Sequence, residues 1–121
     1  MVRQRFTQMW ELLHGMGLKV FQTTITPWTA STDQWRTDAG QTRRLPNFIP
    51  GGLYQRINQW IRSVPPPLTG CFDASAVLDS SVDSGLWTTS RGAPVTSDGA
   101  HPDDWGQQIG AACIDLGQLR L

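Results

Sequence analysis

Apolar residues recur at helical spacing in three separate stretches of the chain. The first holds Phe6, Met9, Trp10 and Leu13, the i, i+3, i+4, i+7 pattern of an amphipathic helix, and two glycines soon after end it. The second runs over residues 53–64 and stops at three consecutive prolines, which cannot continue a helix. The third comprises Trp105, Ile109, Ala112, Cys113 and Leu116. We therefore predict three helices, and we expect the last to pack on a sheet.

Two shorter stretches have the composition of β-strands. Residues 18–26 are rich in β-branched and aromatic side chains and stop at Pro27, and residues 68–72 form a second short run that ends at Asp73. Long polar connections cover residues 27–50 and 79–97. Strands that alternate with helices predict an α/β fold with parallel strands. Because an isolated parallel pair makes a poor sheet, these strands indicate the trailing part of a larger α/β/α sandwich, with one sheet edge open to another chain.

Length and charge narrow the classes of function. The chain has 121 residues, enough for one small domain. Its 10 basic and 10 acidic residues cancel, so nothing favours nucleic-acid or anionic-membrane binding.

The N-terminus lacks a long apolar run and a small-residue cleavage site, so we expect no signal peptide and no transmembrane segment; no compartment is indicated. For Cys71 and Cys113, buried free thiols are favoured over a disulfide.

The most informative stretch is residues 96–106, which contains Asp98, His101 and Pro102. Asp98 and the following glycine form a turn signal. Proline is favoured at the first helical position, which predicts His101 as the N-cap of the last helix. The turn would fold the Asp98 carboxylate toward one ring nitrogen of His101 and leave the other facing outward, as a general base requires. The alternative is a plain turn and cap, in which Asp98 bonds only the backbone.

Several motifs resemble the SGNH (GDSL-type) esterase and lipase family. Asp-Gly-Ala-His-Pro at 98–102, followed by Asp-Asp-Trp-Gly, resembles its closing motif. Residues 17–27 resemble its late central strand, which often ends in Thr-x-x-Pro, and residues 72–79 resemble its final strand and exit loop. The resemblance implies the C-terminal part of a flavodoxin-like three-layer α/β/α sandwich. It also implies a Ser-His-Asp triad that cleaves carboxylic esters, with Asp98 as the orienting acid and His101 as the general base.

The family's other blocks are missing from this sequence. We find no Gly-Asp-Ser nucleophile block, and Ser80 and Ser81 lie in the final loop rather than after a first strand. Asn47 and Asn58 lack the Gly-x-Asn-Asp context of the oxyanion donors. Residues 1–121 are therefore identified as a partial SGNH-type esterase domain that lacks its nucleophile half. A truncated gene, a fragment and one piece of a split protein all remain open.

Two functional hypotheses follow. In the first, the chain is one part of an esterase, and an N-terminal half completes the enzyme. The complete enzyme acts on a small-molecule, carbohydrate or lipid ester. Trp28 and Trp35, in the long loop after the first strand, are candidates for lining its pocket; the alternative is that they only anchor that loop. In the second, the chain is catalytically inactive and acts as an interaction or structural remnant. We expect no cofactor. A metal site built on Asp98, His101 and His14 is disfavoured, because two histidines so placed do not make a three-ligand catalytic site.

Overall fold

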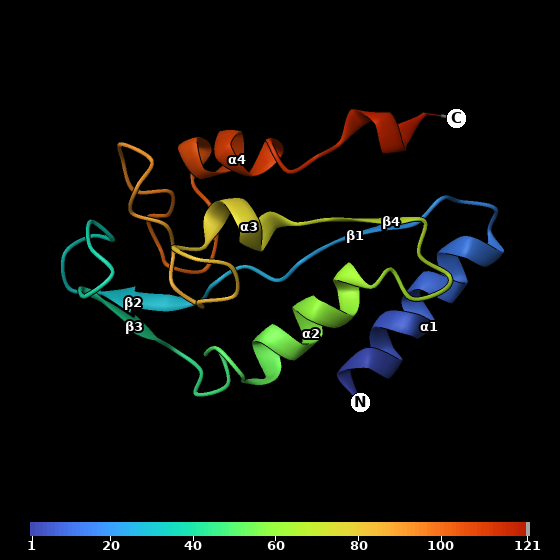
Figure 1. The fold of residues 1–121 in the computed structure, drawn as a ribbon, viewed down its shortest axis with the longest axis horizontal. Coiled ribbons are helices and arrows are strands. Elements are labelled where there is room, and N and C mark those ends of the chain that lie inside the picture. Colours follow the sequence, from blue (N-terminus) through green and yellow to red (C-terminus); the bar gives the residue numbers. More distant parts are fainter. Residues whose placement is uncertain (121) are drawn as a thin grey trace.

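The computed structural model describes residues 1–120 and shows a mixed α/β protein. Figure 1 shows the order of its elements along the chain. They are α1 (Val2–Gly15), β1 (Phe21–Thr23), β2 (Thr29–Ser31), β3 (Gln41–Arg43), α2 (Leu53–Arg62), β4 (Gly70–Phe72), α3 (Ala74–Leu78), α4 (Asp104–Ala111) and the 3₁₀-helix η1 (Leu116–Leu119). Within this part of the chain no helix is long and apolar enough to span a membrane.

The two strands predicted to be parallel do pair with each other. β1 and β4 form a two-stranded parallel sheet in which Phe21 is opposite Gly70 and Thr23 is opposite Phe72. The rings of Phe21 and Phe72 stack at 5.2 Å between centroids. In Figure 1, α1 and α2 lie on one side of these strands and α4 lies on the other, while α3 follows directly at the end of β4.

The first apolar core joins α1 and α2 to the sheet. Its buried members are Trp10, Val20, Ile57, Ile61 and Leu68. The Trp10 and Trp60 rings stack 4.9 Å apart, and the two predicted amphipathic helices are confirmed. Burial of each large apolar side chain contributes about 1.5–3 kcal/mol, so this cluster accounts for much of the stability of the N-terminal half.

The second core lies under the C-terminal helix and corrects two predictions. Its buried members are Ala74, Leu78, Trp87 and Val95, with Ile109 and Cys113 packed against them. The helix α4 therefore packs on α3 rather than directly on the sheet. It also ends at Ala111, because the Asp115 side chain caps a separate 3₁₀ turn by accepting a hydrogen bond from Gly117 N at 2.8 Å. Leu116 is consequently exposed.

The strand predicted over residues 18–26 is shorter in the structure. After Thr23 the side chain of Asn58 takes the place of a neighbouring strand. It accepts a hydrogen bond from Ile25 N at 2.7 Å and donates one to Ile25 O at 3.0 Å. The connection predicted over residues 27–50 also contains structure of its own, the antiparallel hairpin β2–β3, in which Thr29 pairs with Arg43.

The sequence did not predict the short helix α3. Asp73 caps its N-terminus by accepting from Ala76 N at 3.3 Å. Asp73, at which the second predicted strand ends, therefore starts a helix.

Candidate functional site

The Asp98 carboxylate folds back onto His101, as the turn signal predicts. Oδ2 of Asp98 lies 2.8 Å from Nδ1 of the His101 ring. Oδ1 accepts the backbone N–H groups of Ala100 and His101, each at 2.8 Å. The carboxylate therefore bonds both the backbone and the ring, and the alternative in which it bonds only the backbone is wrong.

The turn that carries this pair is fixed by its neighbours. Gly99 has φ +77°, a left-handed conformation that glycine adopts without steric cost. Its carbonyl oxygen accepts the Thr29 N–H and the Trp87 indole N–H, both at 2.9 Å. Thr96 closes the turn from the other side by donating its hydroxyl to His101 O at 2.6 Å. The hairpin β2–β3 and the second core thus hold the Asp98–His101 turn in place.

His101 is not the N-cap of the last helix, which corrects the prediction. Asp103 is the N-cap, and its side chain accepts from Gly106 N at 2.8 Å. Pro102 instead forms an isolated bridge with Thr96, so the helix starts two residues later than proline placement suggested. Because the His101 side chain has no capping role, its ring is free to project from the surface.

The ring and its partner are both open to solvent. The His101 side chain is 81% exposed and that of Asp98 is 53% exposed. The hydrogen bond from the His101 ring, followed by the backbone N–H donors, holds the pKa of Asp98 well below its usual range. An ionised carboxylate only accepts hydrogen bonds, so the assigned tautomer of the neutral ring carries its proton on Nδ1. Nε2 is then the free basic nitrogen.

An open hollow surrounds this pair. Its lining residues are Ser97, Asp98, His101, Pro102, Asp103, Asp104, Trp105 and Gln107. Over residues 1–120, Asp98 is the one side chain hydrogen-bonded to the His101 ring. Ser80 instead shares a hydrogen bond with Ser84 Oγ at 3.1 Å. Ser97 lines the same hollow, but within residues 1–120 no serine hydroxyl is hydrogen-bonded to the acid or to the base.

The two candidate pocket tryptophans lie in different surroundings. The Trp35 indole N–H donates to Thr29 Oγ1 at 2.9 Å, which supports the anchoring alternative, yet Trp35 also lines a hollow beside the one at His101. Trp28 is 41% exposed and does not line the hollow that contains Asp98 and His101.

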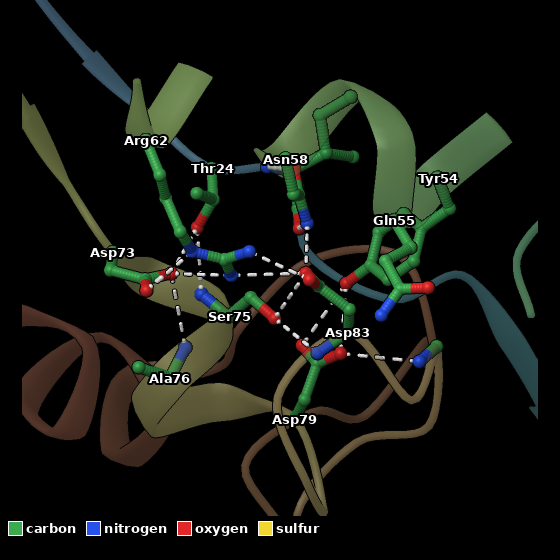
Figure 2. Close-up of polar contacts among 12 residues, drawn as sticks. Thr24, Tyr54, Gln55, Asn58, Arg62, Asp73, Ser75, Ala76, Asp79 and Asp83 are labelled. Atoms are coloured by element: carbon green, nitrogen blue, oxygen red, sulfur yellow. Dashed lines mark hydrogen bonds and ion pairs between the residues drawn. The ribbon is translucent and has the colours of Figure 1, made fainter. Parts of the chain in front are cut away.

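A second polar cluster, buried under α2, was not predicted (Figure 2). Arg62 forms ion pairs with Asp73 at 2.7 Å and with Asp83 at 2.6 Å. Asp83, whose side chain is 2% exposed, also accepts from Asn58 Nδ2 at 2.8 Å and from Ser75 Oγ at 3.2 Å. The hydrogen bonds to Asp73 and Asp83 raise the pKa of Arg62 above its ordinary value.

Asp79 occupies the other end of this cluster. Its carboxylate accepts the Tyr54 hydroxyl at 2.9 Å and Gly85 N at 3.1 Å. Burial raises the pKa of Asp79 to about 7, and burial together with Asp79 raises that of Tyr54. The sequence does contain a signal for the cluster, because Tyr54, Asn58 and Arg62 are spaced four residues apart along one face of a helix.

The geometry of this cluster indicates a structural role. Its acceptors are filled by donors of the protein itself, and no buried side-chain nitrogen or oxygen within the described residues lacks a partner. Among residues 1–120 no group of three or more His, Cys, Asp or Glu side chains is arranged to hold a metal ion.

Cys71 and Cys113 are both free thiols and half-buried, and burial raises the pKa of each.

Comparisons with known proteins add no family. No family model matches this sequence, and no match was found among curated proteins or among solved structures. Function therefore has to be argued from the geometry itself.

Proposed function

We propose that this chain is the C-terminal part of an SGNH-type ester hydrolase, with His101 as the general base and Asp98 as the acid that orients it. The observation that carries the proposal is the 2.8 Å contact between His101 Nδ1 and Asp98 Oδ2 on a ring that is otherwise exposed. With Nδ1 bonded to Asp98, the exposed ring presents Nε2 to the hollow in which both residues lie.

The chemistry follows from the assigned tautomer. Nε2 of His101 accepts the proton of a serine hydroxyl as that oxygen attacks the ester carbonyl carbon, and it then returns the proton to the leaving alcohol. Asp98 holds the Nδ1–H and stabilises the imidazolium that forms between these two steps. The serine and the oxyanion donors are supplied by a complementing N-terminal half, because within residues 1–120 no serine hydroxyl is hydrogen-bonded to the His101 ring.

The fold is compatible with such a half-domain. A parallel sheet of two strands, three residues each, is small for an independent α/β domain. Helices lie on both sides of it (Figure 1). We propose that further strands complete a flavodoxin-like three-layer sandwich alongside this pair.

A second candidate function is a catalytically inactive interaction module. The observation that favours it is the same small sheet, because an edge strand offers backbone N–H and C=O groups to another chain. In this case the Asp98–His101 pair would be retained without a nucleophile.

Reconstitution of ester hydrolysis tests the first function. The chain is coexpressed with an N-terminal half that carries a Gly-Asp-Ser block, and hydrolysis of p-nitrophenyl butyrate by the complex is measured. We expect His101→Ala to lower kcat by at least about 100-fold, the range for loss of a general base. His14→Ala, which removes the one other histidine of the sequence, should leave kcat unchanged.

Two results would contradict the proposal. The first is a complex in which more than about one hundredth of the rate survives His101→Ala. The second is stoichiometric labelling of a serine by a fluorophosphonate in the isolated chain, since the nucleophile is placed outside it.

A further inference from the structure

A groove lined by two tryptophans lies beside the Asp98–His101 hollow. We call it the Trp35–Trp105 groove; the residues that matter for its chemistry are Gln34, Trp35, Pro94, Ser97, Asp103 and Trp105. It shares Ser97, Asp103 and Trp105 with the hollow at His101. At its far end it shares Trp35 and Pro94 with a third hollow that reaches Arg36. The three hollows are therefore neighbours, and the first of them contains the proposed general base.

Both tryptophan rings are fixed in orientation by the protein. The Trp105 indole N–H donates to Arg91 O at 3.2 Å, although the residue is 39% exposed. The Trp35 indole N–H donates to Thr29 Oγ1 at 2.9 Å. Trp35 is half-buried because part of its ring packs against the second core. The part of each ring that lines the groove, with its polar atom bonded to the protein, is apolar surface that a ligand can cover.

The loop that presents Trp35 is held in a conformation that side chains other than glycine rarely adopt. Gln34 and Trp35 have φ +60° and +58°, and each such residue costs about 1–2 kcal/mol. Asp33 holds the loop by accepting from Ser31 Oγ at 2.9 Å and from Arg36 N at 3.2 Å. A hydrogen bond of 2.9 Å from Thr89 Oγ1 to Asp38 ties the same loop to the opposite wall. The groove is thus preformed, which lowers the entropy that a ligand loses on binding.

Polar groups lie between the aromatic surfaces. Gln34 and Ser97 are exposed, and Asp103 lines both the groove and the hollow at His101. A ligand that fits must combine apolar faces, for the rings, with edges that both donate and accept hydrogen bonds. A sugar ring has this combination, with C–H groups on its faces and hydroxyls around its rim.

Two other ligand classes fit less well. A fatty acyl chain would cover Gln34 and Ser97 without bonding them, and each polar group buried without a partner costs about 1–3 kcal/mol. A proline-rich peptide can dock in an aromatic groove. Proline, however, has no backbone N–H, so a run of prolines offers no donor to the exposed Gln34 and Ser97 oxygens.

We propose that the Trp35–Trp105 groove binds an oligosaccharide, whose sugar units stack on Trp35 and Trp105. That the bound oligosaccharide presents an ester-substituted sugar to His101 rests on the proposed function. Binding itself does not, because neither tryptophan takes part in proton transfer.

Binding is measured by NMR titration of the tryptophan indole N–H signals of the chain. The probes are unsubstituted hexasaccharides of β-1,4-linked glucose, xylose, mannose and N-acetylglucosamine. We expect saturable shifts of the Trp35 and Trp105 signals with at least one of them. Trp105→Ala should weaken that binding about tenfold, which corresponds to one lost stacking contact.

Control variants separate the groove from the fold and from catalysis. Trp35→Ala should weaken binding to the same extent, whereas Trp35→Phe, which keeps an aromatic face, should restore most of it. Trp28→Ala removes an exposed tryptophan outside the groove and should leave binding unchanged. His101→Ala should also bind normally, so loss of ester hydrolysis in that variant is a separate result.

Several outcomes would overturn the oligosaccharide proposal. The first is that none of the four hexasaccharides gives a saturable shift. The second is that Trp105→Ala leaves the binding unchanged. The third is that Trp28→Ala weakens the binding as much as Trp105→Ala does. Saturable binding of decaproline or dodecanoate in the groove, with none of the sugars bound, would assign it to a peptide or an acyl chain instead. Each of these outcomes leaves the test of His101 by reconstituted hydrolysis unaffected.

Discussion

Asp98 contacts His101 through both of its carboxylate oxygens. Oδ2 lies 2.8 Å from Nδ1 of the ring, and Oδ1 accepts the His101 backbone N–H at 2.8 Å. The same side chain therefore sets the conformation of the turn and the orientation of the ring that the turn carries. A change at this turn should alter the fold and the base together, unless it keeps Oδ1 as an acceptor.

Gly99 should not tolerate a side chain. At φ +77° a Cβ would clash with the Thr29 carbonyl oxygen and would lie 2.8 Å from the Trp35 ring. We expect Gly99→Ala to cost more than about 3 kcal/mol, the sum of backbone strain and overpacking. The free energy of unfolding from urea titration measures the effect.

The control for this change is Gly17→Ala. Gly17 has a similar φ of +82°, but nothing lies within 4 Å of the added Cβ, so backbone strain alone should cost about 1–2 kcal/mol. Equal losses in the two variants would show that the packing of Trp35 and Thr29 around the turn is not tight.

Asp79 should make the protein less stable as the pH rises toward neutrality. Burial raises the pKa of its carboxyl from 3.8 to about 7, so the folded state holds a proton that the unfolded state has released. The free energy of unfolding should therefore fall between about pH 4 and pH 7 and then level off, by at most about 4 kcal/mol.

Replacement of this carboxyl should remove the slope. Asp79→Asn keeps an acceptor for Gly85 N and can donate to the Tyr54 oxygen, so we expect it to be more stable than the natural protein at pH 8. Urea unfolding at pH 5, 6, 7 and 8 measures the difference, with Asp104→Asn as the exposed control. A slope unchanged by Asp79→Asn would contradict the assignment.

Arg62 should be essential for stability because two carboxylates depend on it. Asp73 and Asp83 are both paired with its guanidinium, and Arg62→Met would leave the buried Asp83 without a cation. Breaking a buried pair in this way costs about 3–5 kcal/mol. Arg56→Met, on the exposed side of the same helix, should cost little, and similar losses in the two variants would contradict the role given to Arg62. Urea unfolding of both variants measures this.

Local patterns predicted the parts of the fold that depend on local sequence. The apolar stripe through Phe6 and Trp10 predicted α1, and the Asp98–Gly99 turn signal predicted the contact with His101. These features depend on spacing within one segment, where helical periodicity and turn chemistry act directly.

Features set by distant partners were mispredicted. The strand after Leu18 is short because Asn58, from another element, bonds Ile25. His101 does not cap α4 because Thr96 pairs with Pro102. The carboxylate partners of Arg62 lie 11 and 21 residues further along the chain, and no local pattern shows that they converge on it.

The most direct test of the central claim is the tautomer of the His101 ring, measured by ¹⁵N NMR in the natural chain and in Asp98→Asn. In the variant the amide oxygen can replace Oδ1 on the two backbone donors. Its NH₂ group then faces Nδ1 and forces the ring proton onto Nε2.

We predict that neutral His101 carries its proton on Nδ1 in the natural chain and on Nε2 in Asp98→Asn, with His14 unchanged between them. A His101 ring that carries its proton mainly on Nε2 in both proteins would contradict the claim that Asp98 prepares His101 as a general base.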